Sequence, residues 1–372
     1  MQGDIIREES MTDLWNVWFT EMHQNRVGLT IKVKKLLYSG ESPFQRIDIL
    51  DTYEFGKMLV LYGSIMITEK DEFVYHEMLS HVPLLSHPNP KQVLVIGGGD
   101  GGTVRETLKH PEVERVTLVE IDEMVVRKCQ EYFPEVAGQL NNPRARLLFA
   151  DGEKFLSTTQ EKFDIILCDA SDPIGPAEVL FQKDFHQMAY DRLNDDGIFV
   201  TQSESPFFHQ RTFKKLYENL SRIFPIVRVY WAYIPTYPSA IWSFTFCSKK
   251  YDPLADFDQE RYKKLQLDTN YYNDEIHHAS FVLPNFIKKH WPDVVVEHNF
   301  GREFQENQQL QSYKLVVHCG GCMIAAQKLL ARIRDLDSVG VPYTNYGVFL
   351  SWMQGPQALR QVLRPWGIDC GD

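Results

Sequence analysis

The sequence predicts an α/β protein in which a small antiparallel β-domain precedes a parallel, doubly wound sheet and an α/β extension follows it. Apolar and polar residues alternate over 14–70, which is typical of strands with one face in a core and the other in solvent. From Lys91 to about residue 250, short apolar runs alternate with amphipathic stretches, the pattern of parallel strands covered by helices. A glycine-rich loop joins the first of these runs to a helix.

The N-terminal β-domain is expected over residues 1–75. Glycine and proline separate its alternating stretches, which are 27–33, 45–50, 58–62 and 65–67. Alternation with a period of two places every second side chain on one face, so these stretches are expected to form a small antiparallel sheet.

The central domain is expected over residues 76–290. Apolar runs predict strands at 93–96, 115–121, 145–150, 163–169, 197–202 and 227–234. Helices such as 180–193 and 206–224 are expected to connect them, and a further helix is expected at 280–289. Strands that alternate with helices in this way normally run parallel in one sheet.

The C-terminal extension is expected over residues 291–372, after a boundary at His290-Trp-Pro292. A strand at 313–318, a helix at 323–336 and a Gly-Val-Pro turn at 340–342 give it an α/β pattern of its own.

Composition and charge restrict the classes of partner. With 39 Lys and Arg against 50 Asp and Glu, the net charge is −11, the wrong sign for a general nucleic-acid or anionic-membrane binder. The surplus of acid is either ordinary solubilising charge or a site for a cationic ligand. The N-terminus is polar and acidic, and no apolar run reaches the length of a membrane span, so a cytoplasmic protein is expected. Six cysteines are too sparse for a disulfide scaffold.

Carboxylates follow several predicted strands. The glycine loop Gly97-Gly-Gly-Asp-Gly-Gly102 contains Asp100, and Glu120, Asp151 and Asp169 end the next strands. Each could be a helix N-cap, but carboxyl ends of parallel strands are where open α/β sheets bind ligands. Glu120 is placed to accept both hydroxyls of a ribose, and Asp151 can accept a hydrogen bond from an adenine amino group.

Asp100 bears on the kind of nucleoside. The carboxylate of ordinary S-adenosylmethionine would lie near the glycine loop and be repelled by this side chain, whereas decarboxylated S-adenosylmethionine would offer a free ammonium to it. The carboxylates together therefore favour a cationic, decarboxylated donor.

Four motifs resemble those of the polyamine aminopropyltransferases, the spermidine synthases. They are Gly97-Gly-Gly-Asp-Gly-Gly102, Asp71-Glu-Phe-Val-Tyr-His-Glu-Met78, Asp169-Ala-Ser-Asp-Pro-Ile-Gly-Pro-Ala177 and Pro235-Thr-Tyr-Pro-Ser239, in the family's order over about residues 14–290. The resemblance implies a Rossmann-like sheet of the class I methyltransferase type behind a β-domain. It implies transfer of an aminopropyl group from decarboxylated S-adenosylmethionine, a co-substrate rather than a permanently bound cofactor, to putrescine, and a homodimer or homotetramer.

The same resemblance implies roles for individual residues. The nucleoside donor would be held by Gln45, His76, Gly97, Asp100, Glu120, Asp151 and Gly152. Asp169 would accept the proton, with Tyr75, Asp172 and Tyr237 around the amine. Animal and plant relatives usually have Gln at the position of His76.

The chemistry requires one local base. Putrescine is a dication at neutral pH, and an ammonium has no lone pair with which to attack the carbon next to sulfur. One amine must lose its proton, and Asp169 is placed to take it, while the other amine stays charged as a handle. Alignment of nitrogen, methylene and sulfonium supplies much of the remaining rate enhancement.

Two further elements are open to two interpretations. The segment 172–177, which contains Pro176 and Gly175, is either a gate over the site or a static surface turn. Glu204 either holds the distal ammonium of the diamine or is a favourable charge at a helix N-terminus ahead of Pro206.

The extension contains one cysteine motif, His318-Cys-Gly-Gly-Cys322. With Gly340-Val-Pro-Tyr-Thr-Asn-Tyr-Gly-Val348 it resembles the C-terminal part of the [FeFe]-hydrogenase maturation GTPase, in which Cys-x-x-Cys and an upstream Cys hold a [4Fe-4S] cluster. This chain lacks that upstream Cys, and His277 and His278 are the nearest candidates. Cys319 and Cys322 are thus cluster ligands, a redox or zinc pair, or part of a metal-free docking module.

Two other functions compete with aminopropyl transfer. A methyltransferase could use the same fold, although Asp100 and the Asp169-Ala-Ser-Asp172 element oppose it. A non-catalytic polyamine-binding scaffold for the C-terminal module would not need the intact Asp169 and Tyr75.

Overall fold

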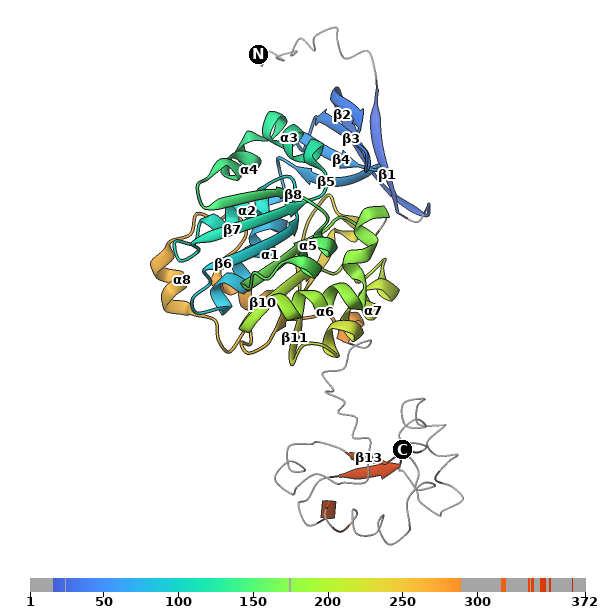
Figure 1. Cartoon of the computed structure of the whole chain (residues 1–372). Coiled ribbons are helices and arrows are strands. Elements are labelled where there is room, and N and C mark those ends of the chain that lie inside the picture. The colour runs from blue at the N-terminus through green and yellow to red at the C-terminus, as the bar shows by residue number, and fades with distance from the viewer. Residues whose placement is uncertain are drawn as a thin grey trace, which may run out of the picture. The chain divides into compact units, whose positions relative to one another are not determined.

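The computed structural model describes residues 16–23, 25–173 and 175–288, together with 316–318, 334, 336–337, 342–345, 348 and 363 near the C-terminus (Figure 1). The chain divides into two compact units, residues 1–292 and 293–372. In the second unit, β13 (Val316–His318) and β14 (Tyr343–Asn345) pair in parallel. Cys319 and Cys322 lie outside the described residues.

The N-terminal strands form a five-stranded antiparallel sheet in the order of the sequence. They are β1 (Trp18–His23), β2 (Val27–Glu41), β3 (Arg46–Thr52), β4 (Lys57–Leu61) and β5 (Ser64–Thr68). Alternation gives the sheet two apolar faces: Leu59 and Leu61 of β4 belong to the main core, whereas Met58 and Val60 of the same strand belong to a separate cluster. The predicted antiparallel β-domain is confirmed.

The central domain contains a seven-stranded sheet of order β11-β12-β10-β9-β6-β7-β8. Its strands are β6 (Gln92–Gly97), β7 (Arg115–Glu120), β8 (Ala145–Phe149), β9 (Phe163–Asp169), β10 (Leu193–Gln202), β11 (Ile226–Tyr233) and β12 (Ile241–Ser248). Neighbours from β10 to β8 are parallel, as predicted.

The expectation of a wholly parallel sheet was wrong at one strand. β12, which the pattern analysis missed, is antiparallel to both β10 and β11. The connection from β11 to β12 runs over only a few residues around Pro238, too few for the crossover that a parallel neighbour would need.

Helices cover both faces of this sheet. They are α1 (Glu72–Ser86), α2 (Gly102–Leu108), α3 (Glu123–Tyr132), α4 (Pro134–Ala137), α5 (Gly152–Thr158), α6 (Lys183–Arg192), α7 (Gln210–Ser221), α8 (Gln259–Leu265), α9 (Asp274–Ser280) and α10 (Asn285–Lys288). Figure 1 shows α5, α6 and α7 on the near face. Among the described helices, none is long and apolar enough to span a bilayer.

Residue 75, the expected end of the β-domain, lies inside α1. One expected helix needs correction. The expected helix at 280–289 is shorter, because α9 ends at Ser280 and α10 begins only at Asn285, directly after Pro284.

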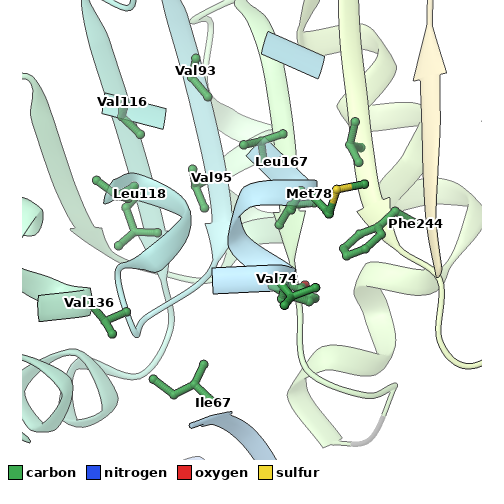
Figure 2. Close-up of a cluster of buried hydrophobic side chains, with 14 of the residues drawn as sticks. Ile67, Val74, Met78, Val93, Val95, Val116, Leu118, Val136, Leu167 and Phe244 are labelled. Atoms are coloured by element: carbon green, nitrogen blue, oxygen red, sulfur yellow. The ribbon is translucent and has the colours of Figure 1, made fainter. Parts of the chain in front are cut away.

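The main core explains why the sheet strands are apolar without alternation. Val93 and Val95 of β6 face α1, where they meet Met78 and neighbours from β7 and β9 (Figure 2). Leu94 and Ile96 point to the opposite face, in a second cluster with residues of α6 and α7. Strands buried on both faces need apolar residues at every position.

Glu77 of α1 is a fully buried charged residue that anchors the segment after α8. Its carboxylate accepts backbone N–H groups of Asn270, Tyr271 and Tyr272 at 2.7, 2.8 and 2.7 Å. A carboxylate that accepts three N–H bonds satisfies donors that would otherwise be buried without partners. Residues 270–272 are therefore part of the first unit's packing.

Replacing Glu77 by Gln tests this anchor. The amide keeps one acceptor oxygen but turns an NH₂ toward N–H groups, so we expect a loss of about 3 kcal/mol in the free energy of unfolding. Urea unfolding followed by circular dichroism measures it. The control Glu260→Gln, at an exposed position of α8, should leave the midpoint unchanged. Equal midpoints for both variants would contradict the anchoring role.

Candidate functional site

A cavity opens at the carboxyl ends of the central parallel strands and is lined on its other side by β-domain residues such as Glu21 and Ile65. Most of the predicted site residues line it: Gln45, Tyr75, His76, Gly97, Asp100, Glu120, Asp151, Gly152, Asp169, Asp172 and Tyr237. Glu204 lies behind Asp172 rather than on the cavity wall, and the side chain of Pro176 lies outside the described residues. The structure thus brings together residues from both domains.

The glycine loop is shaped by its contact with Asp169. Gly97 and Gly98 have φ angles of +78° and +71°. A Cβ on Gly97 would lie 2.1 Å from the Asp169 carbonyl oxygen, and one on Gly98 would lie 2.6 Å from Asp169 Oδ2. Only glycine combines this conformation with so close an approach. These two glycines are needed by the protein itself, and not only to admit a ligand.

The nucleoside end of the cavity is organised around two acids. Burial raises the pKa of Glu120 to about 7, while its Oε1 accepts the N–H of Asp122 at 2.8 Å. Asp122 Oδ2 in turn accepts Gln45 Nε2 at 3.1 Å and Ser42 Oγ at 2.6 Å, which joins the β-domain to the end of β7. Asp122, which is also the N-cap of α3, was not predicted from the sequence.

Asp151 and Asp100 both line the cavity and hold their own helices. Asp151 Oδ1 accepts the N–H of Lys154 at the start of α5 at 3.1 Å. Asp100 Oδ1 accepts the N–H of Gly102 at 2.7 Å. Asp151 is thus the N-cap of α5 and also lines the cavity, whereas the N-cap position of α2 is Gly101, one residue after Asp100.

Asp169 lies at the centre of the cavity with two hydroxyl donors. Thr103 Oγ1 donates to Asp169 Oδ2 at 2.5 Å, and the Tyr75 hydroxyl also hydrogen-bonds to it. Burial, and then the charge of Asp100, raise the pKa of Asp169 to about 6, while His76 and the two hydroxyls oppose the rise. The result is a carboxylate that is ionised near neutral pH and basic enough to accept a proton. Thr103 was not predicted from the sequence.

Tyr237 is held by a loop that α1 organises. Asp71, just before α1, accepts Thr236 N at 3.1 Å and Thr236 Oγ1 at 2.7 Å. The Tyr237 hydroxyl donates to the carbonyl of Met66 at 2.6 Å, and its ring lies 5.9 Å from that of Tyr75. Because its proton is directed to Met66, the phenolic oxygen keeps a lone pair for an incoming N–H.

A second acidic group closes the far end of the cavity. Burial, and then the charges of Glu204 and Glu21, raise the pKa of Asp172 to about 8. Burial also raises the pKa of Glu21 to about 7, despite a hydrogen bond from Ile65 N at 3.0 Å. Glu204 is 2% exposed, has a φ of +68° and lies 2.6 Å from Nδ1 of His209.

The structure changes the interpretation of Glu204 and adds Glu21 to the acids at the site. Glu204 is not a helix N-terminal charge, because α7 begins at Gln210 and the Glu204 side chain contacts Asp172 instead. Glu21 was missed, although the alternation of β1 places it on the inward face with Phe19. A charged residue on the buried side of an alternating strand was the available signal.

One group of described side chains has metal-ligand spacing. Ligand-type atoms of His76, Asp100 and Asp169 lie within 4.8 Å of one another. His76 Nε2 is 3.0 Å from Asp100 Oδ1, so an ion pair between these two accounts for the grouping. In this group, His76 can balance the negative charges of Asp100 and Asp169 inside the cavity.

Three family models match successive parts of the chain. Residues 17–69 match the spermidine synthase tetramerisation domain, and 72–259 match the spermine/spermidine synthase domain. Residues 270–365 match the hydrogen maturase F tetramerization domain. The last match begins inside the first compact unit, where Glu77 binds residues 270–272.

Curated relatives and solved structures cover the first unit. The polyamine aminopropyltransferase of Caldicellulosiruptor saccharolyticus is 49% identical over 273 residues, 73% of this chain and 97% of the relative, and that of Thermoanaerobacter pseudethanolicus is 49% identical over 278 residues, 75% and 99%. A spermidine synthase in complex with the transition-state analogue AdoDATO superposes with a TM-score of 0.73 at 45% identity, over 75% of this chain and 96% of that structure. The Thermotoga maritima spermidine synthase superposes with a TM-score of 0.70 at 45% identity, over 74% and 93%. The chain belongs to the polyamine aminopropyltransferase family of enzymes, the spermine and spermidine synthases.

Proposed function

We propose that this enzyme transfers the aminopropyl group of decarboxylated S-adenosylmethionine to putrescine, which gives spermidine and 5′-methylthioadenosine. The observation that carries the proposal is that one cavity is lined by two groups of acids: Glu120, Asp100 and Asp169 interact with one another, and Asp172 interacts with Glu21. The names of the relatives, polyamine aminopropyltransferase and spermidine synthase, support the same reaction.

The donor occupies the end formed by β6, β7 and β8. Glu120 accepts the ribose hydroxyls, Asp151 and Gly152 face the adenine, and Gln45 closes the site from the β-domain. Asp100 attracts the ammonium of the aminopropyl chain, and it would repel the carboxylate of intact S-adenosylmethionine. The donor enters and leaves as a substrate in each turnover.

The acceptor nitrogen lies between Asp169, Tyr75 and Tyr237. Asp169 accepts a proton from the attacking amine, and the oxygen of Tyr237 accepts a second N–H because its own proton is held by Met66. The nitrogen lone pair then points at the methylene next to sulfur. As the N–C bond forms, the C–S bond breaks, and its electron pair neutralises the sulfonium.

The distal ammonium lies beside Glu21 and Asp172, with Glu204 behind Asp172. Burial raises the pKa of both Glu21 and Asp172, and at Asp172 the charges of Glu204 and Glu21 add to the rise. A diamine brings a positive charge to this end and stabilises the ionised forms. The distance between these acids and Asp169 would then determine which length of diamine fits.

We infer that the C-terminal segment makes contacts between copies of this chain. Its matching family model is a tetramerization domain, and the relatives are almost fully covered without it. A second model of tetramerisation type matches the β-domain, so oligomerisation would involve both ends of the chain.

Replacing Asp169 by Asn tests the proton acceptor. We expect kcat to fall by about 100-fold or more, because an amide cannot take a proton at neutral pH. Methylthioadenosine released from putrescine and decarboxylated donor is the measurement, with exposed Asp184→Asn of α6 as the control. Turnover by the wild type with intact S-adenosylmethionine alone would instead indicate a methyltransferase.

Replacing Glu21 by Gln tests the distal site. We expect the KM for putrescine to rise about tenfold, with kcat little changed, because a charge-assisted hydrogen bond is lost. In the wild type this KM should fall as pH rises through about 7 and 8, where Glu21 and Asp172 lose their protons. The variant should show a shallower dependence. Glu41→Gln, exposed on the same β-domain, should match the wild type.

Truncation after Pro292 tests the C-terminal segment. We expect the shortened enzyme to keep its kcat/KM and to form a smaller assembly in light scattering, because the first unit spans the curated relatives. An unchanged mass would contradict the oligomerisation role.

Iron content of the full chain purified without oxygen, with Cys319→Ala as control, separately tests the cluster that the sequence resemblance implies.

A further inference from the structure

A chain of buried charges extends from the cavity into the interface between α1 and α2. It runs from Asp100 through His76, Glu72, Arg105 and Glu106 to His81, with successive contacts of 3.0, 2.6, 2.9, 2.8 and 3.0 Å. The six side chains in this series are buried or nearly so, and Arg105 is the most exposed at 17%. The proposed reaction uses only Asp100 of this series and leaves Glu72 without a role.

His76 contacts a carboxylate through each ring nitrogen. Nδ1 hydrogen-bonds to Glu72 Oε2 at 2.6 Å, and Nε2 lies 3.0 Å from Asp100 Oδ1. A neutral imidazole would turn the lone pair of one nitrogen toward a carboxylate oxygen, which is repulsive, whereas an imidazolium carries a proton on both. The ring packs directly against the backbone of Gly102, where an added Cβ would lie 2.3 Å from it.

Glu72 is itself fixed in place. Its two oxygens accept Nη1 and Nη2 of Arg105 at 2.9 Å each, a bidentate pair that sets the plane of the carboxylate. Arg105 is anchored in turn by Glu106 at 2.8 Å. Glu72 therefore presents one oxygen to His76 in a defined direction, and it does not touch the cavity.

We propose that Glu72 is a positioning residue that keeps His76 as an imidazolium beside Asp100 and Asp169, so that both acids are ionised when the substrates bind. The proposal rests on the proposed aminopropyl transfer. The imidazolium offsets the repulsion between Asp100 and Asp169, which lie in the same cavity. Asp169 is then ready to accept a proton, and Asp100 to bind an ammonium.

The other groups around His76 and Asp169 fit this role. His76 is faced by Glu72 from α1, Asp100 from the glycine loop and Asp169 from β9, and the Tyr75 ring lies edge-on at 5.5 Å. Asp169 is faced by Asp100, His76, Tyr75, Tyr237, Glu120 and Cys168. Burial lowers the pKa of His76, but Asp100 and Glu72 raise it well above its ordinary value. Burial and Asp100 raise the pKa of Asp169, and His76 lowers it.

The test is the pH profile of Glu72→Gln. The amide can still accept a hydrogen bond from Nδ1 but removes the charge that holds the second proton on His76. We expect the acid limb of kcat/KM for the donor, at saturating putrescine, to move up by about one pH unit, since a lost neighbouring charge shifts a buried acid by that order. The activity ratio of wild type to variant should then be about tenfold larger near pH 5.5 than near pH 8.5.

His76→Gln provides a second variant in case Glu72→Gln folds poorly. It should show the same upward shift, and the double variant should show no further shift, because both changes remove the same imidazolium. Glu106→Gln alters the same buried chain without touching His76, so its acid limb should stay at the wild-type position. Affinity for methylthioadenosine, which has no ammonium, should be unchanged in Glu72→Gln and Glu106→Gln, because neither residue lines the cavity.

A pH-independent loss in Glu72→Gln, or an unmoved acid limb in His76→Gln, would overturn the proposal and leave Glu72 a structural residue. An additional shift in the double variant would also contradict it. Failure of the proposed function is distinct, because then the wild type itself would release no methylthioadenosine from decarboxylated donor and putrescine.

Discussion

The site depends on the contact between the Gly97-Gly98 turn and Asp169, where β6 and β9 end side by side. Gly97 and Asp169 are register partners, and neither glycine could carry a Cβ without overlapping the aspartate. This close approach holds Asp169 against the glycine loop that carries Asp100 and leads into α2, from which Thr103 donates to it. The position of one carboxylate thereby defines the loop, the helix start and the centre of the cavity.

The acids at the two ends of the cavity have different surroundings. Near Asp100 the protein supplies its own cations, His76 and behind it Arg105, so the acids there are balanced before any substrate arrives. At the far end Asp172 and Glu21 are crowded with Glu204, and burial favours their protonated forms. The proposed binding of a diamine there would displace these protons, which links acceptor binding to pH.

Helix α1 connects the two domains physically. Val74 and Met78 pack in the core with Ile67 of β5 and Val95 of β6, so the helix is buried between the β-domain and the sheet (Figure 2). Its polar residues then reach outward to distant parts of the chain: Glu77 to residues 270–272, and Asp71, just before the helix, to the loop of Tyr237. Residues far apart in sequence are aligned in the site because they share this one support.

The sequence by itself determined the two sheets, the glycine loop and the acids at strand ends, because these follow from local periodicity and from the rule that parallel strands end at one edge. It did not reveal β12, whose direction depends on how the short Pro238 connection closes, or Thr103, Asp71 and Glu21. Each of these acts on a partner far along the chain, so its role exists only once packing brings the two together. Tertiary structure alone also decided that Glu72 contacts the ring nitrogen of His76 opposite to Asp100. A pair four residues apart on a helix is visible in the sequence, but the position of Asp100 on the other side of the ring is not.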